Sequence, residues 1–245
     1  NLEKLGISKD IIIQKGNITS FEIIDKLVED FQPSHIYNLA CQSSVSKSFR
    51  EPINTIESIL NGTLNVLEVA RNQCFNGQIF FAGSSEIFGN TKQGADIHHR
   101  HSPNNPYAIG KQSSFSLVKF YREVHKLKCS TGVLFNHESE LRDDNFVTQK
   151  IISGAIYCSK NKNHKLVLGN IEISRDWGWA EEYVEAMQII NTSKKVKDHI
   201  ICTGRVTKLR DFIDIVFRRL GLNYRDHVIS DNQLYRKTDI LQNLL

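Results

Sequence analysis

The chain has 245 residues, of which 40% are apolar and 24% charged, and its formal net charge is +4 at pH 7. This composition is typical of a folded protein with one large domain or two small ones, and it excludes an intrinsically disordered chain. The basic residues are spread along the sequence, which argues against a nucleic-acid-binding surface. No apolar run approaches the roughly 18 residues of a membrane-spanning helix, so we expect no membrane contact.

Five cysteines are widely separated, and none of them forms a C-x-x-C pair: Cys41, Cys74, Cys129, Cys158 and Cys202. Neither a disulfide framework nor a zinc site is indicated, and we expect reduced thiols in a cytoplasmic protein. The chain opens at Asn1 without a methionine and closes on an apolar Leu244-Leu245 pair. We expect both ends to be cut from a longer protein.

Short apolar runs alternate with amphipathic stretches along the chain. We expect strands at residues 11–14, 35–40, 78–83 and 131–135, with short ones near 166 and 200. We expect helices at residues 20–31, 55–73, 106–126, 145–159, 180–191 and 208–220. This order predicts an α/β fold whose doubly wound parallel sheet occupies residues 1–134, followed by a smaller α/β region over residues 135–245.

Ligands of such sheets bind where the strands end, which draws attention to four side chains. Ser84 and Glu86 directly follow the expected strand at 78–83, and Tyr107 and Lys111 lie one turn apart at the start of the next helix. A lysine ammonium beside a phenol lowers the phenol's pKa, so this pair can exchange a proton with a sugar hydroxyl. A Tyr–Lys pair at this spacing is also common on solvated helix faces, and Ser84 and Glu86 alone fit a helix cap and a surface carboxylate.

Several longer motifs carry a family resemblance. They are IYNLACQSSV (36–45), GTLNVLEVAR (62–71), SSEIFG (84–89), PYAIGK (106–111), LFNHES (134–139), NFVTQKI (145–151), LGNIEISRDWGWAEEYVEAM (168–187) and TGRVTKLRDF (203–212). With them the chain resembles the GDP-mannose 4,6-dehydratase family from about residue 16 to residue 236. The resemblance implies a Rossmann-like, NADP-binding domain (NAD being an alternative) and a lyase that converts a GDP-sugar into its 4-keto-6-deoxy form.

The resemblance also implies a role for each catalytic side chain. Ser84, at a position where relatives carry threonine, would hydrogen-bond the reacting 4-hydroxyl, and Tyr107 would deprotonate it while hydride leaves C4. Lys111 would keep Tyr107 acidic and bind the nicotinamide ribose. Glu86 would remove the C5 proton before water leaves C6.

The implied binding residues form two groups. Those for the cofactor are Asn17, Ile18, Leu39, Ala40, Gln42, Ser43, Lys111, His137 and Arg142. Those for the substrate are Asn136, Asn145, Val147, Lys150, Arg175, Arg210 and Arg236. A guanidinium fork matches phosphate oxygens, so the arginines suit a sugar-linked diphosphate.

No G-x-x-G-x-x-G motif occurs in the sequence. In relatives a first strand and glycine-rich loop carry this motif and cradle the cofactor's pyrophosphate, and we expect them to precede residue 1. The segment His98-His99-Arg100-His101 is interpreted as a solvated loop, and no metal is expected.

Relatives pair through two long helices, which match residues 55–73 and 106–126 here. The second helix carries more apolar residues than one buried face needs, so we expect a homodimer, or a tetramer built from it. Two alternatives stay open: a related epimerase or reductase, which needs Tyr107 and Lys111 but not Glu86, and a non-catalytic chain that acts only as a subunit.

Overall fold

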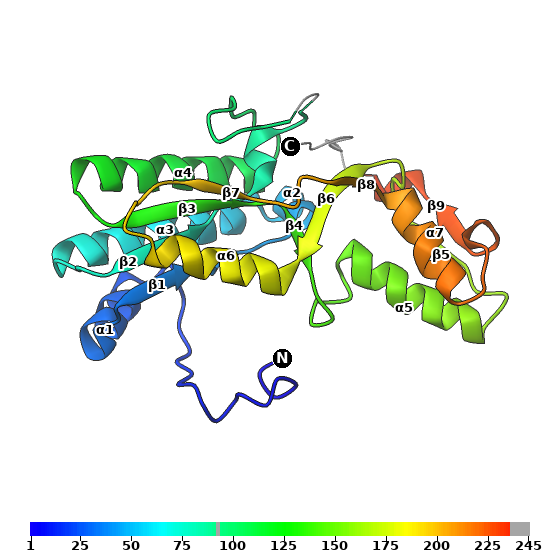
Figure 1. The fold of residues 1–245 in the computed structure, drawn as a ribbon, viewed down its shortest axis with the longest axis horizontal. Coiled ribbons are helices and arrows are strands. Elements are labelled where there is room, and N and C mark those ends of the chain that lie inside the picture. Colours follow the sequence, from blue (N-terminus) through cyan, green and yellow to red (C-terminus); the bar gives the residue numbers. More distant parts are fainter. Residues whose placement is uncertain (92–93, 236–245) are drawn as a thin grey trace.

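The computed structural model describes residues 1–91 and 94–235. Its main sheet consists of four parallel strands in the order β1-β2-β3-β7. They are β1 (His35–Asn38), β2 (Gln78–Ala82), β3 (Cys129–Leu134) and β7 (His199–Ile201). Helices α3 (Pro52–Asn72) and α4 (Pro106–Val124) cover one face of this sheet, and α6 (Ala180–Thr192) covers the other (Figure 1). The predicted doubly wound parallel sheet is confirmed, but its fourth strand, β7, and its covering helix, α6, come from residues beyond position 134.

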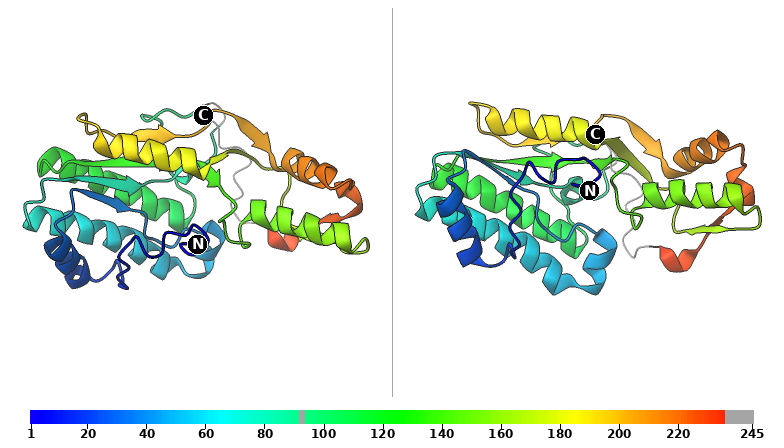
Figure 2. Two further views of the ribbon diagram at one scale, coloured as in Figure 1. Left: turned by 60° about the horizontal axis from the view of Figure 1, so that its bottom comes forward. Right: turned by 90° about the horizontal axis from the view of Figure 1, so that it is seen from below.

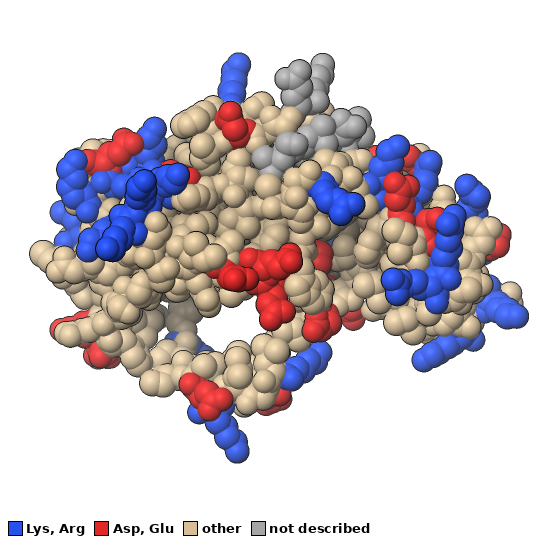
Figure 3. Space-filling model, viewed as in Figure 1, with Lys and Arg blue, Asp and Glu red and all other residues tan. Residues whose placement is uncertain are grey.

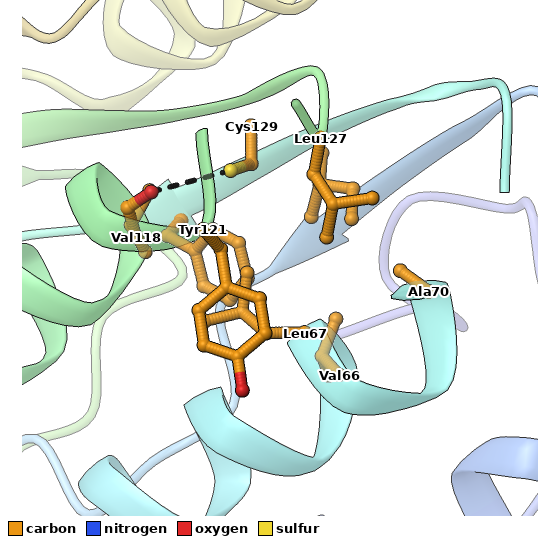
Figure 4. Packing of buried hydrophobic residues seen from close by; sticks show 9 residues of the cluster. Val66, Leu67, Ala70, Val118, Tyr121, Leu127 and Cys129 are labelled. Atoms are coloured by element: carbon orange, nitrogen blue, oxygen red, sulfur yellow. Dashed lines mark hydrogen bonds between the residues drawn. The ribbon is translucent and has the colours of Figure 1, made fainter. Parts of the chain in front are cut away.

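Apolar side chains fill both sides of the sheet. Between the sheet and the α3–α4 pair, a cluster forms from Val66, Leu67, Ala70, Ile79, Phe81, Val118, Tyr121, Leu127 and Cys129 (Figure 4). On the opposite face, Phe80 and Leu134 of the sheet pack against Tyr183 and Met187 of α6. Strand β2 therefore alternates its side chains between two cores, with Ile79 and Phe81 on one face and Phe80 on the other, as a strand covered on both faces does.

Two helices precede α3. Helix α1 (Phe21–Phe31) packs against α3, and the short α2 (Val45–Arg50) follows the loop after β1. The chain before α1 approaches α3 closely, because a Cβ at Gly62 would lie 2.9 Å from the Cγ1 of Ile18. Glycine at this position of α3 allows that approach.

A smaller lobe lies beside one end of the main sheet (Figures 1 and 2). Its strands are β4 (Asn136–Glu138), β5 (Leu166–Leu168), β6 (Ser174–Trp179), β8 (Val206–Lys208) and β9 (Val228–Ser230), and its helices are α5 (Val147–Lys160) and α7 (Leu209–Arg219). Three 3-10 turns complete the described chain: η1 (Ser85–Phe88), η2 (Tyr224–Asp226) and η3 (Asn232–Leu234). Between β6 and β8 the chain returns to the main sheet to form α6 and β7.

The core of the small lobe is separate from that of the main sheet. Helix α5 contributes Ile151 and Ala155, and α7 contributes Ile213 and Phe217. Figure 3 shows Lys and Arg side chains over both ends of the molecule, with Asp and Glu side chains between them. None of the described helices combines the length and apolar character needed to cross a membrane.

The prediction of a strand at residues 11–14 is wrong. These residues form an irregular segment, and the side chains of Ile12 and Ile13 are 74% and 60% exposed. A strand needs a neighbour for its backbone groups and a layer for its side chains, and the described residues offer this segment neither. The three consecutive isoleucines at residues 11–13 are therefore not enough to form a strand.

Five of the described helices and strands were not predicted: α2, β4, β6, β8 and β9. Helix α2 is a single short helix capped by Ser44, whose hydroxyl accepts a hydrogen bond from the Lys47 N–H at 3.3 Å. Strand β6 contains Arg175 and Asp176, and both are buried. Charged residues inside a strand remove the alternation of apolar and polar residues on which strand prediction depends.

Candidate active site

The carboxyl ends of β1 and β2 meet at one edge of the main sheet, and α4 begins beside this edge. After Ala82, the last residue of β2, the chain passes through Gly83 and Ser84 into the 3-10 turn η1, which packs against α4. Ser84 and Glu86 therefore lie next to the helix turn that carries Tyr107 and Lys111.

Local hydrogen bonds fix the turn that carries Glu86. The Ser84 hydroxyl caps η1 by accepting a hydrogen bond from the Glu86 N–H at 3.3 Å. Gly89 closes the turn with φ of 68°, a left-handed conformation that glycine adopts without strain. A Cβ at Gly89 would also lie 2.4 Å from the carbonyl oxygen of Ser102. The position of Glu86 is thus set by its own segment.

Asn105 joins this turn to α4. Its side-chain oxygen caps the helix by accepting a hydrogen bond from the Ala108 N–H at 2.8 Å. An Asn-Pro pair predicts this arrangement, because asparagine is a good N-cap and proline fits the first helical turn. Its amide nitrogen donates to Oε2 of Glu86 at 3.1 Å. The second contact was not predicted, because it joins residues that are 19 positions apart.

The structure brings the four predicted catalytic residues together. Tyr107 and Lys111 are both buried, and the Lys111 ammonium lies 5.7 Å from the centre of the Tyr107 ring. Lys111 Nζ donates to the Ala82 carbonyl oxygen at 2.7 Å. Ser84 forms a side-chain hydrogen bond with Tyr107, and the Glu86 carboxylate is close enough to act on the Tyr107 pKa.

The electrostatics of Tyr107 correct one expectation. Burial raises the pKa of Tyr107, and the opposing effects of the Lys111 ammonium and the Ser84 hydrogen bond do not offset it. Burial lowers the pKa of Lys111, but the charges of Tyr107 and Cys41 outweigh burial, and the pKa is raised overall. Lys111 acts on the phenol in the predicted direction, yet the predicted net lowering of the Tyr107 pKa is wrong because α4 and the sheet remove the phenol from water.

Cys41 was not predicted as part of this site. It follows β1 by a few residues and lines a small cavity together with Lys111 and Thr131, between the sheet and α4. The signal that could have found it is its position just beyond a strand's carboxyl end. Its hydrogen bond with Lys111 makes it part of the ammonium's surroundings.

The predicted cofactor residues after β1 lie at the same edge of the sheet. Leu39, Ala40 and Ser43 are exposed there. Gln42 turns toward α3, because its amide nitrogen donates to the Ser44 carbonyl oxygen and to the Thr55 hydroxyl, each at 2.9 Å.

The other predicted cofactor residues lie on three further segments. Asn17 and Ile18 precede α1, and the Ile18 carbonyl oxygen accepts a hydrogen bond from Asn65 of α3 at 3.1 Å. His137 of β4 is stacked on Tyr183 with a ring-centre distance of 4.7 Å. Arg142 stays within the loop before α5, where its guanidinium lies 3.6 Å from the centre of the Phe146 ring.

The predicted substrate residues are spread over the small lobe. Asn136 lies on β4, Asn145 is in the loop before α5, and Val147 and Lys150 are in the first turn of α5. Arg175 is buried in β6, where it donates to the Ser174 carbonyl oxygen at 2.9 Å.

Arg210 is in the first turn of α7 and forms an ion pair with Glu172. Arg236 lies outside the described residues. The predicted substrate residues that the structure describes thus come from β4, the loop before α5, α5, β6 and α7.

The residues at the sheet edge fit the nicotinamide ribose of a dinucleotide. The Lys111 ammonium has three N–H donors. One of them is used on the Ala82 carbonyl oxygen and another on Cys41, so a donor remains for a ribose hydroxyl. The exposed residues Leu39 and Ala40 leave the neighbouring surface accessible.

The histidine-rich segment packs against η1 and α4. The rings of His99 and His101 contact Phe88 edge-on, with ring centres 5.8 Å and 5.6 Å away, and His101 also contacts Phe115. Among the described residues, no group of three or more His, Cys, Asp or Glu side chains is arranged to hold a metal ion.

Comparison with solved structures supports the fold. The UDP-glucose 4-epimerase of Thermus thermophilus, in complex with NAD, superimposes with a TM-score of 0.87 at 21% identity, covering 99% of this chain and 78% of that chain. A dTDP-glucose 4,6-dehydratase of Streptomyces venezuelae gives a TM-score of 0.86 at 16% identity, covering 98% of this chain and 72% of that chain.

Sequence comparison is more specific. The chain is 36% identical over 229 residues to GDP-mannose 4,6 dehydratase 1 of Arabidopsis thaliana, which covers 92% of this chain and 63% of that protein. It is also 36% identical over 210 residues to the GDP-mannose 4,6-dehydratase of Sinorhizobium fredii (strain HH103), covering 84% of this chain and 60% of that protein. The chain thus spans about six-tenths of the length of these relatives. Residues 1–243 match the family model of GDP-mannose 4,6 dehydratase, and the chain belongs to this family.

Proposed function

We propose that the protein containing this chain is a nucleotide-sugar 4,6-dehydratase that acts on GDP-mannose or a related GDP-linked sugar. The observation that carries the proposal is the presence of Glu86 in the same cluster as Tyr107 and Lys111. An epimerase or reductase needs the phenol and the ammonium, whereas a dehydratase also needs a base for a second carbon. Family membership supports the same interpretation.

In the proposed reaction, Tyr107 acts at C4 of the sugar and Glu86 acts at C5. Tyr107, hydrogen-bonded to Ser84, takes the proton of the sugar's 4-hydroxyl. The resulting 4-ketone acidifies the C5 proton, which passes to the Glu86 carboxylate, and the electron pair of the C5–H bond forms the enolate. The C6 hydroxyl then leaves as water with the proton held by Glu86, which gives a C5=C6 double bond.

A bound nicotinamide cofactor would accept hydride from C4 and return it to C6, and C5 would take up a proton in place of the one that Tyr107 removed from the 4-hydroxyl, so that the net reaction is loss of water. Lys111 and the backbone after β1 would hold its ribose, while Asn17, Ile18, Gln42, His137 and Arg142 are proposed contacts from the family resemblance. We propose NADP as this cofactor, with NAD as the alternative. The similar UDP-glucose 4-epimerase of Thermus thermophilus was solved in complex with NAD. This similarity supports a nicotinamide cofactor but does not distinguish NADP from NAD.

The two lobes would share the substrate between them. We propose that residues 1–134 bind the cofactor and that residues 135–245 mainly bind the sugar nucleotide, with Arg175, Arg210 and Arg236 near its diphosphate. The engagement of Arg210 with Glu172 means that this ion pair must open before the guanidinium can hold a phosphate. A cytoplasmic location is supported by the five cysteines, all of which are free.

We also propose a homodimer built on α3 and α4. Of the five apolar side chains of α4 behind this expectation, Val118 and Tyr121 are buried, and Phe115 and Leu117 pack on the chain's own cores. Phe120 is 49% exposed. Of these five side chains, only Phe120 is therefore left largely exposed for a partner.

The activity is tested with the full-length protein, GDP-mannose and NADP. The product should have lost one water molecule and carry a 4-keto group, as seen by mass spectrometry. Glu86→Gln should lower kcat about 10²–10⁴-fold, since an amide cannot accept the C5 proton. In a single turnover it should accumulate reduced cofactor, because C4 oxidation does not use Glu86.

Glu57→Gln on the exposed side of α3 is the matched control and should leave the rate unchanged. A product of unchanged mass would identify an epimerase. Full activity of Glu86→Gln would refute Glu86 as the base, and absence of any turnover by the full-length protein would favour the non-catalytic subunit.

A further inference from the structure

Asn105 is a buried polar side chain whose two ends serve different partners. Only 2% of the residue is exposed. Its oxygen accepts from the Ala108 N–H at 2.8 Å, and its nitrogen donates to Glu86 Oε2 at 3.1 Å and to the Asn104 side-chain oxygen at 3.0 Å. The helix cap determines which way the amide faces, because only the oxygen can accept the Ala108 N–H.

The orientation of the amide has a consequence for Glu86. With Oδ1 held at the end of α4, the NH₂ group must face the η1 turn, where Glu86 Oε2 is located. A hydrogen bond to one carboxylate oxygen leaves Oε1 free to accept a proton from a substrate. It also fixes the rotation of the carboxylate, which three flexible side-chain torsions would otherwise leave open.

The cap also relates Glu86 to Tyr107. Asn105 is the residue before α4, and Tyr107 is the second residue of that helix. The base for C5 and the phenol for C4 are therefore both attached to one helix end, one through a side-chain hydrogen bond and one through the backbone. Adjacent carbons of one sugar ring require two groups with a fixed separation.

We infer that Asn105 is a positioning residue that aims the Glu86 carboxylate at C5, in addition to capping α4. This inference rests on the proposed dehydratase function. It assigns Asn105 to the second chemical step alone, since Tyr107 and Lys111 make no hydrogen bond to it in the described chain.

The test uses Asn105→Ser and Asn105→Asp in the full-length protein. Both residues cap helices about as well as asparagine, so α4 should keep its cap, and the melting temperature of Asn105→Ser should stay within a few degrees of the wild type. Serine lacks the amide that reaches Glu86, and aspartate replaces that donor by a second negative charge. In a single turnover with GDP-mannose and NADP, the appearance of reduced cofactor reports C4 oxidation, and its disappearance reports C5 deprotonation together with the steps that follow it.

For Asn105→Ser we expect the appearance rate to stay within about twofold and the disappearance rate to fall about 10–100-fold, the range for losing a hydrogen bond to a charged group. Asn105→Asp should slow disappearance further, because two carboxylates repel. Equal slowing of the appearance and the disappearance of reduced cofactor would show that the substitution disturbs the whole site. No slowing of either would show that Asn105 only caps α4. Either result overturns the inference.

The proposed function fails in a different way. A wild-type protein that never reduces the cofactor would refute dehydratase activity itself, and the inference with it. An active wild type with a kinetically normal Asn105→Ser variant would refute the role of Asn105 and leave the function standing.

Discussion

The ammonium nitrogen of Lys111 donates to the carbonyl oxygen of Ala82 at 2.7 Å, which ties α4 to the last residue of β2. This contact holds the positive charge beside Tyr107. Burial raises the pKa of Tyr107, and the Lys111 charge lowers it in part. The relationship decides the pH at which the phenol can act as a base.

Replacing Lys111 by methionine should remove the opposing charge and raise the Tyr107 pKa further. Because the proposed reaction needs the deprotonated phenol, the rising limb of kcat/KM against pH should move to higher pH, and the neutral-pH rate should fall about 10²–10⁴-fold. Lys119→Met on the exposed side of the same helix is the control. A limb that stays in place would show that another group controls the phenol.

A second prediction concerns the ion pair between Arg122 and Asp198. The guanidinium of α4 donates to both carboxylate oxygens, at 2.8 Å and 2.5 Å, and the side chains are only 15% and 9% exposed. The same carboxylate accepts the Thr131 N–H of β3 at 2.8 Å. Asp198→Ala leaves a buried cation and a backbone donor without their partner, so the free energy of unfolding should fall by about 3–5 kcal/mol.

Urea denaturation measures this change, and the chain supplies a control pair. Lys119 and Glu123 on α4 lie 4.0 Å apart with side chains 56% and 59% exposed. Glu123→Ala should therefore cost less than about 1 kcal/mol. Comparable losses for the two variants would contradict the structural role of Asp198.

A third prediction concerns stability at high pH. Burial raises the pKa of the Cys129 thiol to about 12, whereas an unfolded thiol titrates near about 8.5. The folded chain therefore resists deprotonation: the stability from this group is fully present below the unfolded pKa and is lost as pH rises toward the folded pKa. The free energy of unfolding should fall between about pH 9 and about pH 12.

Tyr121 contributes in the same window, because burial and the Glu68 hydrogen bond raise its pKa to about 12. Cys129→Ala should thus flatten the pH dependence in part, as measured by urea denaturation at several pH values. Cys74→Ala, at an exposed position, should leave the slope unchanged. An unchanged slope for Cys129→Ala would disprove the assignment.

The proposed dimer gives a fourth prediction. The full-length protein should have at least a dimer mass in light scattering at micromolar concentration, and Phe120→Lys should shift it toward the monomer by placing a charge in the contact. Ile215→Lys on α7, where the native side chain is 55% exposed, should not change the mass. A monomeric wild-type protein would refute the proposal.

The sequence predicted the parallel sheet and its long helices because periodicity reports which faces are covered. It also predicted that Tyr107 and Lys111 share a helix face, since residues four apart always do. The net pKa of Tyr107 could not be predicted in this way. The spacing reports the charge next to the phenol, but the loss of water depends on what α4 packs against.

Contacts between distant residues were also beyond the sequence. The cap at Asn105 was predicted from Asn-Pro, yet its bond to Glu86 depends on how η1 packs on α4. At residues 11–14 the sequence predicted an element that the structure does not contain. Their composition favours a strand, but whether a strand forms depends on a neighbouring strand to pair with. Family resemblance supplied the roles of the other residues, whose placement comes from the structure alone.

The return of the chain to the main sheet has a consequence for synthesis on the ribosome. When residue 134 has emerged, the Phe80 and Leu134 side chains have no cover on one face, because α6 follows only at residues 180–192. The nascent chain must therefore carry an exposed apolar face while more than forty further residues are made, about the distance from residue 134 to Ala180. During that interval the exposed apolar face makes the half-built sheet prone to aggregation, and translation pauses before α6 would lengthen its exposure.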